Sequence, residues 1–211
     1  MRQTYVFDFD GTLVDTMDVV VKVLLDFLHK RGIAYPENIL KTISPLGYKG
    51  IAEYYVKEFS LSESPQEVYA TLFNEVSDAY KNDFKAKPMA DYVLRKLVSQ
   101  GYSLNILTAS PRELVAPCVK RLGWEKLFDN IFTTEDFRLN KSEPYVFIET
   151  AKALGRNAED CLMIDDSLNA LLNAKKAGMK TIGVYDVHSA KDELKMRASV
   201  DKYILLLDEL L

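Results

Sequence analysis

The stretch DFDGTLVD occupies residues 8–15 and directly follows the apolar run YVF at 5–7. Asp8 and Asp10 stand where this predicted buried strand gives way to a turn at Gly11. Because side chains alternate along an extended strand, the two carboxylates point to the same side. Like charges this close repel, and a fold keeps them only where a cation or a shared proton relieves the repulsion. The stretch therefore predicts a polar site at the end of a buried strand.

The bulk composition narrows the class of protein. The chain has 211 residues, 48% hydrophobic and 27% charged, which is typical of a soluble globular protein that buries a full core. A net charge of −4 without a long basic run disfavours a nucleic-acid partner. Because no segment has the length of a signal peptide or membrane helix, we expect a cytoplasmic protein that does not associate with membranes. Cys118 and Cys161 fit no zinc or redox motif and are expected to be buried thiols.

The residues after the first predicted strand (3–8) are helical for a long way. Apolar residues recur over 19–28 at the spacing of one helix face, and Gly32 ends that helix. Pro36 opens a second helix, and further helices are predicted near 50–60 and 65–83. Between them, the SPLG sequence at 44–47 breaks the pattern. We therefore expect a small all-helical domain over residues 16–85, inserted after the first strand.

From residue 88 onward, predicted strands and helices alternate. Strands are expected at 103–108, near 131–132, at 161–165 and at 181–184. Helices are expected at 88–100, from Pro111, at 144–154 and up to 177. This alternation predicts an α/β core, a doubly wound parallel sheet with helices on both faces, formed by residues 1–15 and 86–211. Ligands of such sheets bind beyond the carboxyl ends of the strands.

Polar side chains gather at those strand ends. They are Asp8 and Asp10, then Thr108 with Ser110, then Lys141, then Asp165 and Asp166. Carboxylate oxygens suit Mg²⁺, which is bound by a few carboxylates together with a substrate phosphate. The hydroxyls, the lysine and the N–H groups of the helix starting near Pro111 suit the oxygens of that phosphate. The sequence thus predicts a site for Mg²⁺ and a phosphate ester.

The same residues resemble the four ordered motifs of the haloacid dehalogenase superfamily. The matching stretches are DFDGTL at 8–13, LTAS at 107–110, Lys141 with Pro144, and IDDS at 164–167. The resemblance covers nearly the whole chain, because the helical segment is similar to that superfamily's cap domain in its first insertion site. Within the superfamily, the chain is most similar to phosphoglycolate-phosphatase-like enzymes. The resemblance implies a Rossmann-like core and phosphatase activity.

The resemblance also implies roles for the acidic residues. Asp8 is expected to be the nucleophile that forms an aspartyl-phosphate. Asp10 is expected to protonate the leaving alcohol, then to activate water, and to bind Mg²⁺ through its backbone carbonyl. Asp166 is expected to ligate Mg²⁺, with Asp165 beside it directly or through water. Asp8 completes the expected metal site.

Other residues are expected to hold the transferring phosphoryl group. Thr108 and Lys141 position it and stabilise its charge, and Gly11, Ala109 and Ser110 are expected to line the phosphate site.

Two positions depart from the family's usual pattern. A further Asp often stands four residues after the first acid of the fourth motif, but residues 167–170 read SLNA. The adjacent acids Asp165 and Asp166 match the family's other variant. The lysine is commonly followed at once by proline, whereas Lys141 is followed by Ser142 and only later by Pro144.

Plainer interpretations stay open for several of these residues. The Asp-Gly pair could be a solvated turn, and the hydroxyls at 108 and 110 could cap a helix. Lys141 by itself would be a surface lysine, and the acids at 165–166 could cap the next helix. Residues 47–49 could be an ordinary turn, or a loop in which Gly47 and Lys49 contact the substrate. His29 and His188 are expected at the surface.

We predict a Mg²⁺-dependent phosphatase acting on a small-molecule phosphate monoester, as a monomer or weak homodimer. A dehalogenase of the same superfamily would not need Asp10. A phosphosugar mutase shares the core motifs, but residues 17–21 (MDVVV) offer no basic group or histidine after Asp15. A phospho-aspartate signalling module would carry its acids and lysine in another order and would lack the helical insert. The sequence does not name the ester.

Overall fold

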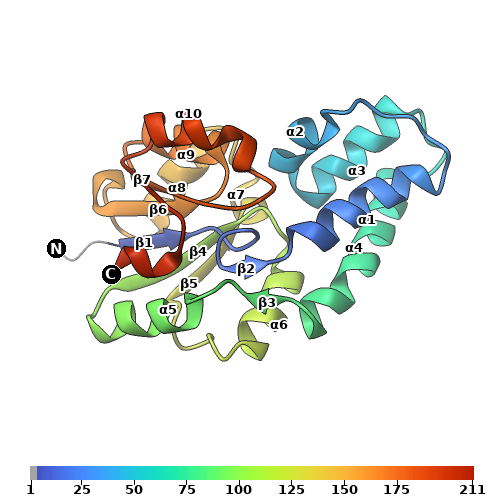
Figure 1. Cartoon of the computed structure of the whole chain (residues 1–211). Helices are drawn as coiled ribbons and strands as arrows, with labels where there is room; N and C mark the ends of the chain where they lie inside the picture. Colours follow the sequence, from blue (N-terminus) through green and yellow to red (C-terminus); the bar gives the residue numbers. More distant parts are fainter. Residues whose placement is uncertain (1–3) are drawn as a thin grey trace.

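Six parallel strands form the central sheet of the computed structural model, which describes residues 4–211 (Figure 1). Their order across the sheet is β5-β4-β1-β6-β7-β8. Their bounds are β1 Thr4–Phe7, β4 Ser103–Thr108, β5 Asn130–Thr133, β6 Cys161–Asp165, β7 Lys180–Val184 and β8 Lys202–Ile204. Because β1 lies between β4 and β6, the chain winds outward from it in both directions, which places a switch point at the end of β1.

Alternation along the strands divides the core between the two faces of the sheet. Tyr5 and Phe7 belong to one buried cluster, and Val6 belongs to the other. The first cluster includes α5 (Ala90–Ser99) and α6 (Arg112–Arg121), and the second includes α8 (Tyr145–Ala153), α9 (Leu168–Lys176) and α10 (Glu193–Ser199). The predicted doubly wound parallel sheet with helices on both faces is confirmed. Cys118 and Cys161 are buried and free, as expected.

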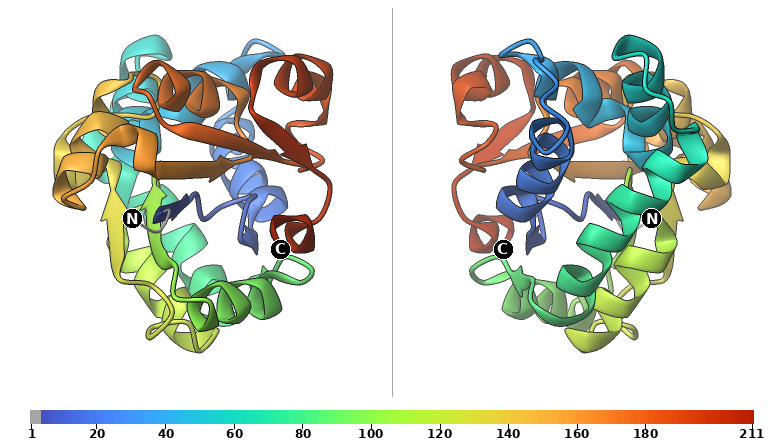
Figure 2. Two further views of the ribbon diagram at one scale, coloured as in Figure 1. Left: turned by 90° about the vertical axis from the view of Figure 1, so that its left-hand side faces the viewer. Right: turned by 90° about the vertical axis from the view of Figure 1, so that its right-hand side faces the viewer.

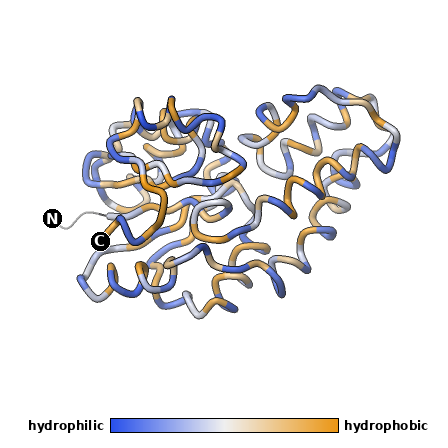
Figure 3. Tube along the Cα trace, viewed as in Figure 1, coloured by the Kyte–Doolittle hydropathy of each residue, from blue (hydrophilic) through white to orange (hydrophobic). Residues whose placement is uncertain are grey.

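Four helices form a separate body at the far end of the core, which we call the helical insert. They are α1 Met17–His29, α2 Ile39–Ile43, α3 Gly47–Glu58 and α4 Pro65–Asn82. Helix α4 begins with a capping box, in which Ser64 and Glu67 satisfy each other's backbone N–H groups, and Pro65 takes the first helical position. Hydrophobic and hydrophilic residues alternate along these helices (Figure 3), and their apolar faces pack together around Phe27 and Tyr55.

A short antiparallel ribbon joins the insert to the core. Strand β2 (Val14–Asp15) carries the chain out of the core, and β3 (Lys85–Ala86) brings it back. The two views in Figure 2 have the insert behind the core on one side and in front of it on the other. The insert therefore lies beyond one end of the sheet and covers neither of its faces. This is the end where β1, β4 and β6 finish.

The structure differs from the sequence predictions in several elements. Residues 47–49 were predicted as a break between helices, but they form the first turn of α3, after a 3₁₀ turn over Ser44–Leu46. Gly47 makes this possible because its φ of 67° turns the chain directly from one helix into the next. Strand β8, α10 and the short helix α7 (Thr134–Phe137) were not predicted. Among the described residues, no helix has the length and apolarity needed to span a membrane.

Candidate active site

Three buried carboxylates meet where β1 and β6 end. Asp8 follows β1, and its backbone N–H donates to the carbonyl of Ile164 in β6 at 2.8 Å. This pairing places Asp8 beside Asp165 and Asp166, and one carboxylate oxygen from each residue lies within 4.8 Å of the others. All three side chains are buried. The ends of β1 and β6 therefore lie together, as the sequence predicted, because the two strands are parallel neighbours in the sheet.

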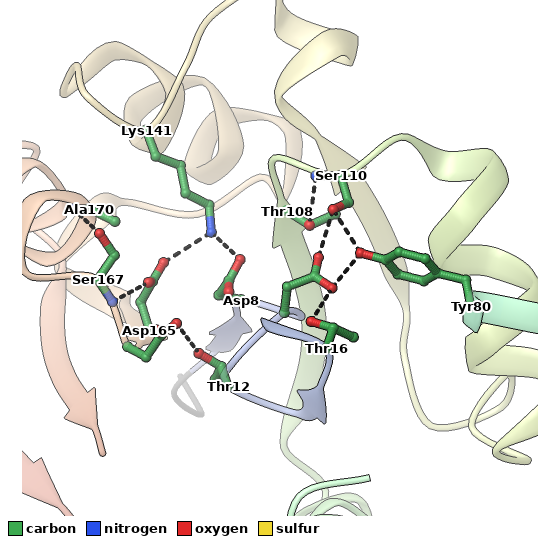
Figure 4. Close-up of polar contacts among 12 residues, drawn as sticks. Asp8, Thr12, Thr16, Tyr80, Thr108, Ser110, Lys141, Asp165, Ser167 and Ala170 are labelled. Carbon is green, nitrogen blue, oxygen red and sulfur yellow. Dashed lines mark hydrogen bonds and ion pairs between the residues drawn. The ribbon is translucent and has the colours of Figure 1, made fainter. Parts of the chain in front are cut away.

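Lys141 bridges two of these carboxylates (Figure 4). Its Nζ lies 2.5 Å from Asp8 Oδ1 and 3.0 Å from Asp165 Oδ2, although it comes from the loop between α7 and α8. Burial by itself would lower the pKa of Lys141. The negative charges of Asp165 and Asp8 have the larger effect and hold this pKa above its ordinary value. The lysine is therefore a permanent cation next to Asp8.

The departure from the usual lysine–proline pair has a local structural explanation. The side-chain oxygen of Asn140 accepts the Ser142 N–H at 3.0 Å, which forms a turn around Lys141. On the other side, Asn173 of α9 donates to the Lys141 carbonyl at 3.4 Å. These two contacts fix the lysine backbone without proline.

Electrostatics within the cluster favour a bound cation. Burial raises the pKa of Asp8 to about 7, with Asp165 and Asp10 adding to the effect and Lys141 opposing it. Burial and the neighbouring acids Asp165 and Asp8 also hold the pKa of Asp166 well above its usual range. The one positive charge of Lys141 does not balance three carboxylates. A buried set of oxygen donors with this excess of negative charge fits a hard divalent cation such as Mg²⁺.

Gly11 provides the space that this cluster needs. Its φ is +80°, and a Cβ at this position would lie 3.0 Å from the carboxyl atoms of Asp166. The next residue, Thr12, donates from its hydroxyl to Asp166 Oδ1 at 3.3 Å. The DG turn of the opening motif is therefore not a solvated surface turn: it packs against the second acidic motif 154 residues away.

Asp10 occupies a different environment, a short distance from the cluster. Its Oδ1 accepts hydrogen bonds from Tyr80 at 2.5 Å and Thr16 at 2.8 Å, and its Oδ2 accepts one from Ser110 at 2.7 Å. In Figure 4, Tyr80, Thr16 and Ser110 lie close together, away from Lys141. Burial and the Asp10 charge hold the pKa of Tyr80 well above its usual value, so Tyr80 remains a hydroxyl donor. Three hydroxyl donors thus fix the position of the Asp10 side chain in this arrangement.

The hydroxyls after β4 do not cap the following helix. Pro111 is the N-cap of α6 and receives no side-chain capping bond. Instead, Thr108 Oγ1 accepts the Ser110 N–H at 3.0 Å, and Ser110 donates to Asp10. The acids at the end of β6 do not cap α9 either, since Ser167 does so through the Ala170 N–H. The capping alternatives for both motifs are therefore wrong.

A cavity of about 560 Å³ opens from this cluster toward the helical insert. Of the residues predicted for the site, those that line it are Asp8, Asp10, Gly47, Thr108, Ala109, Ser110, Lys141, Asp165 and Asp166. Gly47 approaches the loop after β4 closely, because a Cβ on it would lie 3.1 Å from the Ala109 carbonyl. Lys49 lies elsewhere: it pairs with Glu135 at 2.9 Å and lines a neighbouring hollow.

Two residues of the site were not found from the sequence. Tyr80 comes from α4 at a position that fits the buried apolar face of that helix, so its pattern predicts a core residue. His188 was expected at the surface, but it is half-buried, lines the cavity and contacts Asp18 at 2.7 Å. No local pattern signals either contact, because the partners are 70 and 170 residues away.

Proteins of known name resemble the chain over its whole length. A phosphoglycolate phosphatase from Psychrobacter arcticus is 27% identical, with 100% of this chain and 96% of that protein covered. The structure of CbbY from Rhodobacter sphaeroides in complex with phosphate superposes with a TM-score of 0.84, at 18% identity, over 100% of this chain and 96% of that one. A β-phosphoglucomutase from Clostridium difficile has a TM-score of 0.79 at 21% identity, over 100% and 94%. At these identities the two structures establish the shared fold.

A family model describing haloacid dehalogenase-like hydrolases matches residues 5–184. The matched region runs from β1 to the end of β7, and therefore contains the acidic cluster, Lys141, the hydroxyls after β4 and the helical insert. The resemblance inferred from the four motifs is confirmed by this match and by the fold. The chain belongs to the haloacid dehalogenase-like hydrolases.

Proposed function

We propose that the protein is a Mg²⁺-dependent phosphatase that hydrolyses small-molecule phosphate monoesters through an aspartyl-phosphate on Asp8. The observation that carries this proposal is the position of Asp8. It is a buried carboxylate that contacts Lys141 at 2.5 Å, lies beside two further acids and lines the cavity. A phosphatase is also the named activity of the Psychrobacter relative.

In the first step, a carboxylate oxygen of Asp8 attacks phosphorus, and the bond from phosphorus to the alcohol oxygen breaks. Asp10, in its protonated form, gives its proton to that oxygen, so the alcohol leaves neutral. Lys141 stabilises the charge on the phosphoryl oxygens, together with the Thr108 hydroxyl and the N–H groups at the start of α6.

In the second step, water attacks the phosphorus of the aspartyl-phosphate. Asp10 takes the proton from this water, inorganic phosphate leaves, and the Asp8 carboxylate is restored. The three hydroxyl contacts of Asp10 in this structure hold its side chain toward Tyr80. Proton transfer to substrate therefore requires the Asp10 side chain to turn from these hydroxyls into the cavity.

Asp8, Asp165, Asp166 and the Asp10 carbonyl are the groups that would hold Mg²⁺. When bound, Mg²⁺ supplies positive charge that offsets repulsion between the nucleophile and the phosphate. The carboxylate donor set and its excess negative charge fit this ion.

The test is phosphate release by the purified full chain from a panel of phosphate monoesters, with Mg²⁺ and with a chelator. We expect release that depends on Mg²⁺ and disappears in Asp8→Asn, while Asp15→Asn, which changes an exposed acid of β2, retains it. Release that survives Asp8→Asn or chelation contradicts the proposal. A hexose 1-phosphate in the same panel tests for a mutase, whose product is an isomeric phosphate and no free phosphate.

A further inference from the structure

The wall of the cavity that faces the catalytic cluster is apolar. On the side of the helical insert it is formed mainly by Met17, Val20, Val21, Leu24, Leu40 and Ile51. Met17, Val20, Val21 and Leu40 are only half-buried, so they present apolar surface to the cavity. Val21 belongs to neither hydrophobic cluster, and it lines the cavity. Water in contact with this wall is released when an apolar group takes its place.

Few polar groups on the insert can bind a substrate here. Its polar side chains in the lining are Lys41, Ser44 and Tyr48. Lys41 and Ser44 are exposed, and the Ser44 hydroxyl already donates to the Leu40 carbonyl at 2.6 Å. On the side of the insert, a leaving group with several hydroxyls would therefore lose bonds to water without gaining equivalent partners. The other polar residues of the lining outside the catalytic cluster belong to the core, and they are Ser167, Asn169, His188, Ser189, Lys191 and Asp192.

Tyr48 adds no accessible polar group to this wall. It is only 5% exposed, and its buried hydroxyl lies beside the Tyr80 side chain. The preceding residue, Gly47, contacts the loop after β4. The insert therefore presents a mainly apolar surface to the cavity.

We propose that the substrate is a phosphate monoester of an apolar, ring-containing alcohol, whose ring packs against the apolar wall of the insert. This inference rests on the proposed phosphatase function. The phosphate lies on Lys141 and the hydroxyls after β4, and the ring packs on the wall formed by α1, α2 and α3. A cavity of about 560 Å³ has the size of ordinary small-molecule sites.

The test compares three esters of primary alcohols, so that the leaving groups are similar in reactivity: 2-phenylethyl phosphate, glycerol 1-phosphate and phosphoglycolate. The full chain is assayed with Mg²⁺ for phosphate release. We expect kcat/KM for 2-phenylethyl phosphate to exceed that of the two polar esters by about tenfold or more, since burying the ring is worth at least that much. Equal or higher values for a polar ester overturn the inference and leave the phosphatase intact. No release from any ester overturns the phosphatase as well.

Two variants on α1 distinguish a specific effect of the apolar wall on KM from a general effect of mutation. Val21→Thr replaces a methyl group at the cavity by a hydroxyl, and should raise KM for 2-phenylethyl phosphate about three- to tenfold. Val19→Thr makes the same change at an exposed position outside the cavity lining and should leave KM unchanged. An equal effect of both variants contradicts the apolar wall.

Discussion

The two walls of the cavity contrast in chemistry. The wall at the strand ends of the core carries buried acids and a lysine that binds two of them, whereas the wall formed by the insert is largely apolar. Charged groups at fixed positions stabilise a transferring phosphoryl group, and an apolar surface favours one leaving group over another. Under the proposed function, the core would perform the reaction and the insert would select the substrate.

The two walls are connected at Asp10. This core acid accepts hydrogen bonds from Ser110 in the core, from Thr16 where the insert begins, and from Tyr80 near the end of α4. A change in the position of the insert relative to the core therefore changes the hydrogen bonds of the proposed acid–base residue. Variants on the core wall should lower the rate for every ester, and variants on the insert wall should change the preference among esters. Variants at this junction should lower the stability of the fold.

The largest effect is expected on the core wall. Lys141→Gln removes the cation that lies 2.5 Å from Asp8 and 3.0 Å from Asp165. We expect kcat/KM for phosphate release to fall by about 10²–10³-fold for every ester, because charge stabilisation of the transferred group is lost. Steady-state kinetics on two esters measures this. If the loss is confined to one ester, Lys141 acts in selection and the contrast between the walls fails.

The metal prediction follows from the repulsion in the acidic cluster. Mg²⁺ at a hundredfold excess over its Kd should stabilise the fold by about 2.7 kcal/mol, or roughly 5–10 °C in melting temperature. In Asp166→Asn the metal-free protein should melt higher than wild type, since one buried like charge is gone, and the gain from Mg²⁺ should largely disappear. Scanning fluorimetry measures both quantities. A variant that retains the full gain would show that Asp166 is not a ligand.

The increase in melting temperature on adding Mg²⁺ should also depend on pH. The pKa of Asp8 is raised from 3.8 to about 7 in the folded chain, so the fold favours its protonated form. The stability of the metal-free protein therefore decreases as pH rises between these two values, and Asp8 is mostly charged only above about 7. The increase in melting temperature on adding Mg²⁺ should be larger at pH 8 than at pH 5. A gain independent of pH contradicts this.

A smaller effect is expected where the walls meet. Tyr80→Phe removes one of the three hydrogen bonds to the Asp10 carboxylate. The free energy of unfolding should fall by about 1.5–3 kcal/mol, because the lost bond is to a charged group. Urea denaturation measures this, and Tyr92→Phe at an exposed position serves as the control. Equal stability of the two variants would mean that Tyr80 does not link insert and core.

The smallest effect is expected at Lys49. Its ion pair with Glu135 joins the insert to the core at the surface, with 62% of the lysine side chain exposed. Such pairs contribute about 0–1 kcal/mol, so Lys49→Gln should change stability by no more than this and leave KM within about twofold. A large rise in KM would instead support the substrate contact predicted from the sequence, and would add a charged group to the selecting wall.

The strand ends were predictable because their signals are local. Each motif follows an apolar run, and parallel strands bring their carboxyl ends to one edge whatever the details of packing. Hence the proximity of Asp8, Thr108 and Asp165 follows from their motifs alone. The contacts of Tyr80 and His188 could not be predicted, because an aromatic residue on a buried helix face and a lone histidine carry no signal for a partner far away in the chain.

The sequence by itself determined the order of the elements, the parallel sheet, and the residues of the acidic cluster with Lys141, since periodicity and motif order depend only on neighbouring residues. Only the tertiary structure decided that Gly47 starts a helix against Ala109, that Lys49 pairs outside the cavity, and that three hydroxyls hold Asp10. These features depend on how the insert packs on the core, and that packing is a sum of distant contacts that no local pattern specifies.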